Sequence, residues 1–552
     1  MGEFREIWRA GHLPDVSLLV VWSGSSPNAR LLTVLSKSSF LKGRQCPRRL
    51  WLAINRPPEP AVDPDEVWEM REAEGALVEA QAERLFPGIV TVSEPTDDDE
   101  PREARPDITS LAERTRLALR EHLPVAQAYL QAEGLLSITD ILEPREGGWF
   151  VWEVKASTSI KPIHLWDLGF QAEVARRAGL DVVGSGVIRL DPDYARGTEL
   201  APTRLLVRED CTAAVAPNEA AVRQEIAAQL ASLSEAAVPT ARPSSHCKVS
   251  RDAKEGNRPS TCGQLGDSGF CGTQLPVHWA GRLPRLMPPK WAEILAMADP
   301  SIERLDPAER VGKKDKWTTD QQRCIRAVKS GHPEIDPSAL RAELSNLHWP
   351  IAFVDFEFDT GMAVPRFSGC QPYDLVPFQW SMLIQGQSGG GLVECDPFLH
   401  IDATDPRRPF AEALLAALPP EGSIVAHHAD AETRVINQLA DRLGGQVADQ
   451  LRALVPRIFD TETLAKAGYC HADQKGSWSI KKLAPALLGK GYEGLGIQNG
   501  LAAVAAWKRA CSESDLNTRT TLRADLLAYC GRDTSLMHDI VERLRAIAAG
   551  RP

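Results

Sequence analysis

The chain has 552 residues, of which 43% are hydrophobic and 25% are charged. At roughly 100–200 residues per domain, this length corresponds to about three or four domains, or to two large domains with attachments. The composition is ordinary for a folded globular protein and excludes disordered and collagen-like chains. No apolar run approaches the roughly 20 residues that cross a bilayer, so we expect no membrane partner. Charged residues rather than an apolar signal sequence follow Met1, and we therefore expect a cytoplasmic protein.

The formal net charge is −11, from 63 basic and 74 acidic residues. Taken alone, this balance disfavours a nucleic-acid partner, because phosphate binding needs cations. A net charge does not describe a local patch, however, so a nucleic-acid partner stays possible. The 11 cysteines are scattered and odd in number. Without an export signal we expect no disulfide framework, and the alternatives are metal ligands or plain buried thiols.

The chain order predicts the following elements. Residues 1–34 read as a weakly ordered extension, residues 66–86 as a helix, and residues 94–107 as an acidic, proline-rich loop. Over residues 135–157, two short apolar runs joined by a Gly-Gly turn predict a β-hairpin. We expect a helix at 163–178, a strand at "GSGVIRL", a mainly helical connector over 281–345, and a new α/β domain that opens with the buried strand "PIAFVDFEF".

The predicted hairpin carries a candidate site. Asp140 lies at the end of its first strand, and Glu153 and Lys155 share one face of the second because the period of a strand is two. Two carboxylates and a lysine that converge can hold a divalent cation and orient a water, which phosphodiester hydrolysis requires. The alternative is a solvent-facing strand edge with ordinary charges. The apolar flanks of Glu153 favour a central strand instead.

The segment "TDILEP…WEVKAS" resembles the core of the PD-(D/E)XK nucleases, in their RecB-like branch. "DLGFQAEVARRAG" places Gln171 where that branch carries a glutamine after its catalytic lysine. "EGALVEAQAERLFPG" resembles the upstream helix, with Glu79 as an additional metal-side residue. The resemblance implies a restriction-endonuclease-like fold in which Asp140, Glu153 and Glu79 bind Mg²⁺ or Mn²⁺.

Four cysteines flank this core: Cys46 in "RQCPRRLWL", then Cys247, Cys262 and Cys271. One cysteine before and three after resemble the iron–sulfur members of the RecB-like branch, which include CRISPR-associated exonucleases. The resemblance implies a [4Fe–4S] cluster that staples the two ends of the domain. A zinc ion held by four cysteines, or four unrelated thiols, are the alternatives, and the wide spacing leaves Cys211 as a substitute for Cys262.

A second set of carboxylates lies towards the C-terminus. "AFVDFEF" places Asp355 and Glu357 on one face of a strand, and "LLAYCGRDTSLMHDI" places Tyr529 and Asp533 at helical i and i+4 positions. "IVAHHADAETRVI" runs from a strand into a helix and carries Glu432. Four converging carboxylates would repel one another unless divalent cations lie among them. Two such cations about 4 Å apart form the usual phosphodiesterase arrangement.

These motifs resemble the DnaQ-like 3′–5′ exonucleases of the RNase H-like fold, in the DEDDy subclass, where Tyr529 would position the nucleophilic water. Two positions depart from that pattern: Glu432 replaces an aspartate and His428 replaces an asparagine. Asp430 is the alternative ligand. The substitutions also leave room for a degenerate module that binds without cleaving.

From about Leu35 the whole chain resembles one uncharacterised bacterial family that joins the two modules. We therefore expect an α/β protein with a PD-(D/E)XK domain over 35–280, the connector over 281–345 and an RNase H-like domain over 346–552. The expected activity is a metal-dependent nuclease, with DNA favoured over RNA, in repair or defence. The alternatives are a nucleic-acid-binding scaffold with one dead site and an RNA-processing exonuclease. Basic residues that could contact phosphates, or merely form a solvated face, are Arg44, Arg48, Arg49, Lys481 and Lys482.

Overall fold

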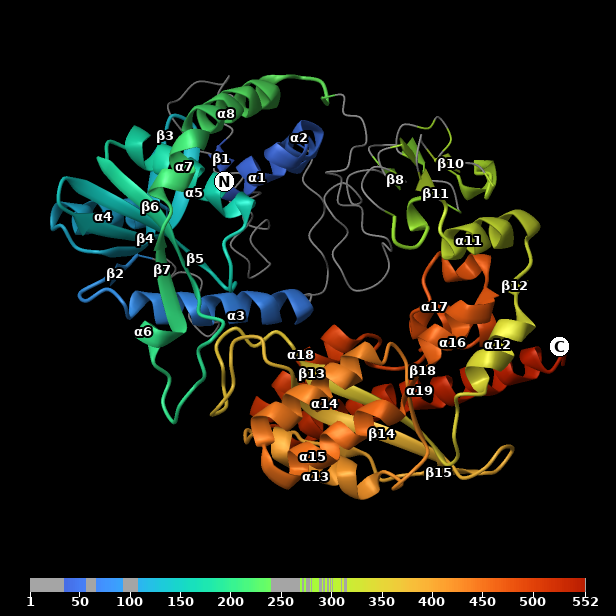
Figure 1. Cartoon of the computed structure of the whole chain (residues 1–552). Coiled ribbons are helices and arrows are strands. Elements are labelled where there is room, and N and C mark those ends of the chain that lie inside the picture. The colour runs from blue at the N-terminus through green and yellow to red at the C-terminus, as the bar shows by residue number, and fades with distance from the viewer. Residues whose placement is uncertain are drawn as a thin grey trace. The chain divides into compact units, whose positions relative to one another are not determined.

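The computed structural model describes residues 34–55, 66–92, 108–239 and 315–551, together with short stretches between 269 and 311 (Figure 1). The chain divides into two compact units. The first unit comprises Met1–Thr273 and Ala363–Pro372, and the second comprises Gln274–Met362 and Tyr373–Pro552. The expected extension before residue 34 and the acidic loop at 94–107 lie outside the described residues.

Within the described residues, the first unit contains a seven-stranded mixed sheet in the order β2-β3-β4-β5-β6-β7, with β1 paired to β4. β4 is antiparallel to both β3 and β5, and β6 is antiparallel to β7, whereas β2 and β3, β5 and β6, and β1 and β4 are parallel pairs. The predicted hairpin is therefore confirmed as β4 and β5. The strands are β1 (Leu35–Ser36), β2 (Val90–Thr91), β3 (Val125–Ala132), β4 (Leu135–Arg145), β5 (Gly148–Lys155), β6 (Val182–Leu190) and β7 (Leu206–Asp210).

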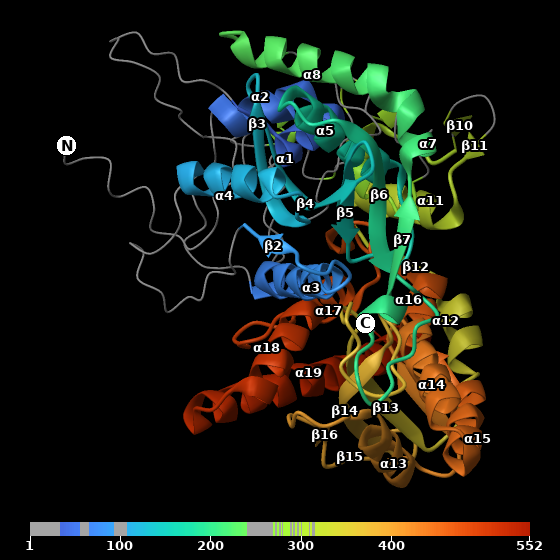
Figure 2. The same cartoon turned by 90° about the vertical axis from the view of Figure 1, so that its left-hand side faces the viewer.

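Helix α5 packs along β3 to β6, and α1, α2 and α8 gather beside it (Figure 2). Alternate residues of β5, such as Trp149 and Val151, point into the core under α5. Because side chains alternate along a strand, Glu153 follows them onto that face. The helices are α1 (Lys37–Gln45), α2 (Pro47–Asn55), α3 (Glu66–Glu83), α4 (Ile108–Arg120), α5 (Pro162–Arg177), α6 (Pro202–Leu205), α7 (Thr212–Val215) and α8 (Glu219–Ser234).

The second unit contains, among its described residues, a six-stranded mixed sheet in the order β15-β14-β13-β17-β18, with β16 paired to β14. β13 is antiparallel to β14 and parallel to β17, and β17 is parallel to β18. The strands of this sheet are β13 (Ile351–Asp359), β14 (Val376–Gln385), β15 (Leu392–Glu394), β16 (Phe398–Leu399), β17 (Ser423–Ala426) and β18 (Ile458–Asp460). Short pairs are β8 (Gly269–Phe270) with β9 (Thr273–Gln274), β10 (Arg310–Val311) with β11 (Asp315–Lys316), and β12 (Glu334–Ile335) with β19 (Tyr469–Cys470).

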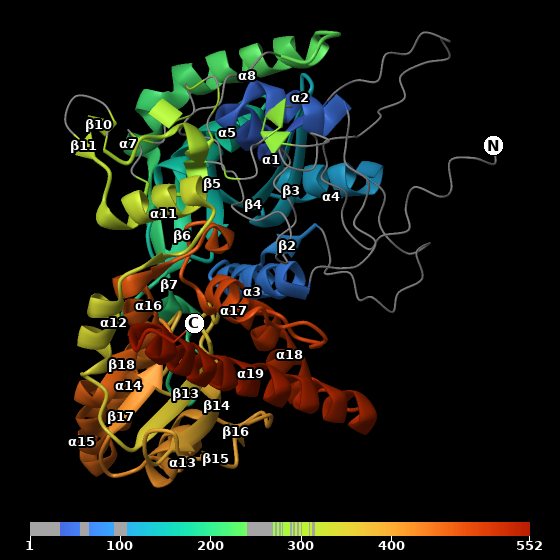
Figure 3. The ribbon, with the colours of Figure 1, turned by 90° about the vertical axis from the view of Figure 1, so that its right-hand side faces the viewer.

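Helices cover both faces of the β13–β14 pair. Val354 and Phe356 pack with Phe410 of α13 and Val435 of α14 in one core. On the other face the long helix α19 lies against β13 and β14 (Figure 3). The helices are α11 (Thr319–Ser330), α12 (Pro337–Leu344), α13 (Arg407–Ala417), α14 (Asp430–Leu443), α15 (Gly445–Leu454), α16 (Thr461–Gly468), α17 (Ile480–Leu488), α18 (Gly500–Ser512) and α19 (Leu516–Ala548).

The segment between β13 and β14 leaves the second unit. Residues 363–372 belong to the first unit, where the carboxylate of Glu74 accepts hydrogen bonds from the backbone N–H of Ala363 and from Arg366, both at 3.1 Å. Arg196 donates to the carbonyl of Pro365 at 2.7 Å. The protein is thus a mixed α/β protein of two units, and one segment from the second half of the chain belongs to the first unit. Among the helices that the structure describes, none combines the length and apolar character that a membrane span requires.

Candidate functional site

The first candidate site lies on the face of the sheet that α5 covers. The register that pairs Ile141 with Trp152 places Asp140 opposite Glu153 on neighbouring strands. Oδ2 of Asp140 accepts the backbone N–H of Val154 at 2.8 Å, which fixes its carboxylate beside β5. Glu153 is 1% exposed and Asp140 is 8% exposed. The hairpin therefore brings the two sequence-predicted acids together in a buried environment.

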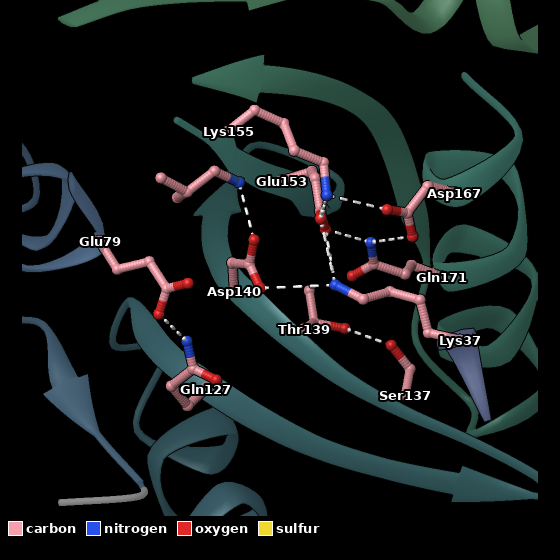
Figure 4. A network of polar contacts seen from close by, with 11 residues as sticks. Lys37, Glu79, Gln127, Ser137, Thr139, Asp140, Glu153, Lys155, Asp167 and Gln171 are labelled. Atoms are coloured by element: carbon pink, nitrogen blue, oxygen red, sulfur yellow. Dashed lines mark hydrogen bonds and ion pairs between the residues drawn. The ribbon is translucent and has the colours of Figure 1, made fainter. Parts of the chain in front are cut away.

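Two lysines flank these acids (Figure 4). Nζ of Lys37 lies 3.1 Å from both carboxylate oxygens of Glu153 and 3.6 Å from Oδ1 of Asp140. Nζ of Lys155 contacts Oε1 of Glu153 and lies 3.0 Å from Oδ2 of Asp167. The predicted lysine is thus in place. The sequence analysis missed Lys37, which lies 116 residues before its partner.

Helix α5 supplies the remaining partners. Gln171 donates to Oε2 of Glu153 and, at 3.1 Å, to Oδ1 of Asp167, one turn earlier on the same helix. Both helix residues are buried, at 0% for Gln171 and 2% for Asp167. Sequence reasoning found Gln171 and missed Asp167. The signal that could have found it is the i, i+4 spacing of two polar residues on an otherwise apolar helix face.

Glu79 lies at the side of this network. Its Oε2 accepts a hydrogen bond from Gln127 at 3.0 Å (Figure 4). Burial raises the pKa of Glu79, and the charge of Glu153 adds to the effect while Lys37 opposes it. The charges of the site therefore shift the pKa of Glu79, while the hydrogen bond from Gln127 joins its side chain to β3.

Burial and neighbouring charges set different protonation states within the site. Burial, reinforced by Glu153, raises the pKa of Asp140 to about 8. Burial would also raise the pKa of Glu153, but Lys37 and Lys155 outweigh it and hold this pKa well below its usual range. Burial opposes the charged form of Lys155, yet Glu153 and Asp167 raise its pKa above the ordinary value. Near neutral pH the site therefore holds an ionised Glu153, a charged Lys155 and an Asp140 close to its titration point.

Of the four predicted cysteine ligands, only Cys46 lies among the described residues, so the cluster stays a prediction. Cys46 ends α1 and is half-buried, whereas Cys247, Cys262 and Cys271 lie outside the described residues. The alternative, Cys211, is buried at the start of α7.

The three arginines near Cys46, which we expected could contact phosphates, each contact a neighbouring residue of the chain. The guanidinium of Arg44 lies 3.1 Å from the centre of the Trp166 ring, and Arg48 donates to the carbonyl of Pro239 at 3.5 Å. Arg49 donates to Gln45 on the same stretch of chain.

The second candidate site lies between β13 and α19. Phe353 contacts His538 of α19, and Cys530 of the same helix lies 3.5 Å from Oδ2 of Asp355. Alternate residues of β13 therefore face α19, and Asp355 and Glu357 share that face. One carboxylate oxygen from each of Asp355, Glu357 and Asp533 lies within 4.8 Å of the others, and no other such trio of metal-ligating residues occurs in the described part of the chain.

Glu432 of α14 lies outside that trio, but its charge raises the pKa of both Asp355 and Glu357. It is 6% exposed, and its Oε2 is buried without a hydrogen-bond partner. Asp430, two residues earlier in the same first turn, is exposed. The structure therefore turns Glu432 inward and leaves the alternative residue Asp430 in solvent. A buried, unpaired carboxylate oxygen beside three further acids fits a site for divalent cations.

The two histidines before α14 have structural partners. His427 contacts Oγ1 of Thr461 at 2.8 Å and the carbonyl of Trp478 at 2.9 Å. His428 is exposed, adopts a φ of 62°, and contacts Oε2 of Glu462 at 2.7 Å. Its backbone N–H donates to Asp460, which also caps α16. The side chain that replaces the expected asparagine therefore points to Glu462 rather than to the acids.

Aromatic residues and a lysine close the second site. Tyr529 lies one turn before Asp533 on α19 and is buried. Tyr492, which the sequence analysis missed, donates its hydroxyl to Oδ1 of Asp533. Nζ of Lys481 lies 5.4 and 5.5 Å from the ring centres of Tyr492 and Tyr529, and it donates to the carbonyl of Gln498 at 2.7 Å. The charge of Lys481, which we expected to contact phosphate, opposes the raised pKa of both Glu357 and Asp533.

Burial and mutual repulsion raise the pKa values of the four acids. Burial, and then Asp533, raise the pKa of both Asp355 and Glu357 well above their usual range. Burial raises the pKa of Glu432 to about 8. It raises that of Asp533 to about 6, against the opposing hydrogen bond from Tyr492. Without cations, Asp355, Glu357 and Glu432 therefore favour their protonated forms near neutral pH, and a bound cation would displace those protons.

A family model described as a domain of unknown function (DUF2779) matches residues 352–479. That span contains Asp355, Glu357 and Glu432 and ends before Tyr529 and Asp533. No curated protein sequence matches the chain.

Proposed function

We propose that the chain is a metal-dependent nuclease with one active site in each unit. The observation that carries the proposal is the cluster of Asp355, Glu357 and Asp533, whose ligand oxygens lie within 4.8 Å of one another. The buried, unpartnered oxygen of Glu432 supports it. Evolution rarely buries four acids together without a counter-charge, because each would lose its hydration. Divalent cations are the counter-charge that phosphodiesterases use.

In the second site we assign the four acids to hold Mg²⁺ or Mn²⁺. When bound, such cations lower the pKa of water and neutralise charge that develops on the phosphate. Tyr529 would position the attacking water, and Lys481 lies where a phosphate could meet it. This assignment, with the order of β13, β14, β17 and β18, supports an RNase H-like fold of the DnaQ type and removal of nucleotides from 3′ ends.

In the first site Asp140 and Glu153 would hold the cation. Lys155, fixed by Asp167, would orient a water and stabilise the charge of the cleaved phosphate. Gln171 fixes Glu153 from α5. The arrangement of two acids and a lysine on a β-hairpin, with a glutamine on the following helix, supports a PD-(D/E)XK fold of the RecB-like branch.

DNA is the substrate that we favour, since the first module resembles DNA-repair and defence nucleases. A [4Fe–4S] cluster on Cys46, Cys247, Cys262 and Cys271 remains part of the proposal. Anaerobically purified protein should then be brown, with broad visible absorption. Colourless protein with stoichiometric zinc would contradict the cluster and leave the two carboxylate sites in place.

The central experiment is a cleavage assay. End-labelled single- and double-stranded DNA and RNA are incubated with Mn²⁺ and the full-length protein, as wild type, Lys155→Ala and Asp355→Ala. Lys161→Ala and Asp449→Ala serve as matched controls. Lys161 is an exposed lysine of the first unit, six residues after Lys155, and Asp449 is an exposed acid of α15 in the second unit. Each site variant should remove one component of the cleavage, and the controls should retain both.

The results of this assay distinguish the proposed nuclease from the alternative functions. Wild-type protein that degrades nothing would contradict the enzyme. Loss of all cleavage in Lys155→Ala, with no effect of Asp355→Ala, would make the second unit a binding module. Degradation of RNA with intact DNA would replace the DNA assignment with RNA processing.

A further inference from the structure

Lys37 occupies an unusual place in the first site. Its ammonium lies within 3.1 Å of both oxygens of Glu153 and 3.6 Å from Asp140, so it sits between the two acids that we assign to a metal (Figure 4). Lys155 contacts Glu153 as well, but its second partner is Asp167. Among the described residues, Lys37 is thus the cation that both proposed ligands share.

The fold fixes the backbone position of Lys37. β1 pairs in parallel with β4, and Ser36 lies opposite Leu136 on the strand that carries Asp140. Ser36 then caps α1 by accepting the backbone N–H of Ser39 at 3.2 Å. Lys37 is consequently the first residue of α1. The pairing of β1 with β4 fixes its backbone position relative to Asp140.

The position is unfavourable for a lysine on local grounds. The N-terminus of a helix carries a partial positive charge, which favours acidic residues and disfavours cations in the first turn. The first turn of α1 contains no acidic residue. The side chain is nevertheless turned towards the acids, where Asp140 and Glu153 supply the negative charge that a lysine needs there. The charge of the site, not the helix, therefore explains a lysine at this position.

We propose that Lys37 is a built-in counter-ion, which neutralises Asp140 and Glu153 in the metal-free protein and withdraws into solvent when a divalent cation takes its place. The proposal rests on the metal site assigned to the first unit. An ammonium that contacts both oxygens of Glu153 and a cation bound to the same carboxylate exclude each other by charge and by space. The Lys37 side chain is 26% exposed, so part of it already borders solvent.

Mn²⁺ binding tests the exchange. The parent protein carries Asp355→Asn and Glu357→Gln, so that the second site does not contribute to Mn²⁺ binding. Calorimetry measures Mn²⁺ binding to this parent and to two variants of it, Lys37→Gln and Lys42→Gln. Lys42 lies on the same helix and serves as the control. Lys37→Gln should bind Mn²⁺ more tightly by at least about fivefold, the lower end of couplings between linked binding events. Lys42→Gln should match the parent.

Thermal unfolding gives a readout without substrate. In EDTA, Lys37→Gln should unfold at a lower temperature than the parent, because it removes the cation that contacts both Asp140 and Glu153. Saturating Mn²⁺ should remove this difference. A variant that is equally destabilised with and without Mn²⁺ would make Lys37 a purely structural residue.

Competitive acetylation with acetic anhydride, read by mass spectrometry, needs no substitution at Lys37. Its labelling in the parent should rise when Mn²⁺ is added. If Mn²⁺ binds while the labelling and the Lys37→Gln affinity stay unchanged, the exchange is wrong and the metal site stands. If the parent binds no Mn²⁺, the metal site and the exchange both fail.

Discussion

Oδ2 of Asp167 lies 3.0 Å from Nζ of Lys155, and Oδ1 of the same carboxylate accepts the side-chain amide of Gln171. One buried carboxylate thus ties the predicted lysine of β5 to the predicted glutamine of α5. Since Lys155 and Gln171 both contact Glu153, Asp167 closes a ring of four side chains. The ring fixes the direction of the Lys155 side chain, as the water-orienting role that we propose for it requires.

Asp167→Asn tests that role. The amide keeps the size of the side chain and removes the charge, so Lys155 loses a partner and its pKa falls. We expect first-unit cleavage, measured in an Asp355→Asn background, to fall about 10- to 100-fold, as is typical for residues that support a site without touching the substrate. The alkaline limb of the pH–rate profile should move to lower pH. Asp193→Asn, at an exposed position after β6, is the control, and an unchanged profile in Asp167→Asn would contradict the role.

Glu432→Gln tests the second metal site. Glu432 has a buried oxygen with no hydrogen-bond partner, whereas Asp430 is exposed. We expect Glu432→Gln to weaken Mn²⁺ binding to the second unit by at least about tenfold, the smallest loss typical even of residues that only support a ligand. Asp430→Asn should bind as wild type does. Calorimetry in a Lys155→Ala, Glu153→Gln background isolates this site, and the reverse ranking of the two variants would make Asp430 the ligand.

The stability of the metal-free protein should fall as the pH rises. Burial raises the pKa of Glu432 from the ordinary 4.5 to about 8, so the folded chain keeps a proton that the unfolded chain releases. This stabilisation is complete below pH 4.5 and is lost as the pH rises through about 8. The free energy of unfolding should therefore decline between these values, by at most about 1.4 kcal/mol per pH unit from this group.

Denaturant unfolding in EDTA measures that slope. Glu432→Gln should flatten it relative to wild type, and Asp430→Asn should not. Saturating Mn²⁺ should flatten or reverse the wild-type slope, because binding replaces the protons. A wild-type slope that is already flat between pH 5 and 8 would mean that Glu432 is ionised in the metal-free fold.

His428 adopts a φ of 62° at an exposed turn. Asparagine tolerates this left-handed conformation, whereas a β-branched side chain clashes with the backbone. We expect His428→Asn to retain the wild-type unfolding temperature. His428→Val should lower stability by about 1–2 kcal/mol, the cost of a left-handed residue. Equal stability of the two variants would show that the turn relaxes. The contact with Glu462 is exposed at the histidine and should contribute little.

Local periodicity predicted the parts of both sites that lie close together in sequence. The hairpin places Asp140 opposite Glu153 because strand pairing follows from two apolar runs and a tight turn. Asp355 and Glu357 share a face for the same period-two reason, and the helical spacing of Tyr529 and Asp533 is that of one turn. These relationships need no knowledge of tertiary packing.

The remaining parts depend on packing and could not be predicted in this way. Lys37 reaches Glu153 across 116 residues, and its approach is set by the pairing of β1 with β4. Tyr492 meets Asp533 from a loop with no periodic pattern. The choice between Asp430 and Glu432 is decided by the rotation of α14 on the sheet, since both residues lie in the same first turn.

Residues 363–372 have a practical consequence for genetic dissection. The chain passes between the two units after Thr273, after Met362 and again after Pro372, so neither unit is a single contiguous stretch. A fragment that stops at Thr273 loses the backbone partners of Glu74 and Arg196. A fragment that starts at Gln274 carries ten residues that belong with the other half. Truncation therefore cannot assign the two proposed activities to the two units, and point substitutions in the intact chain are the better test.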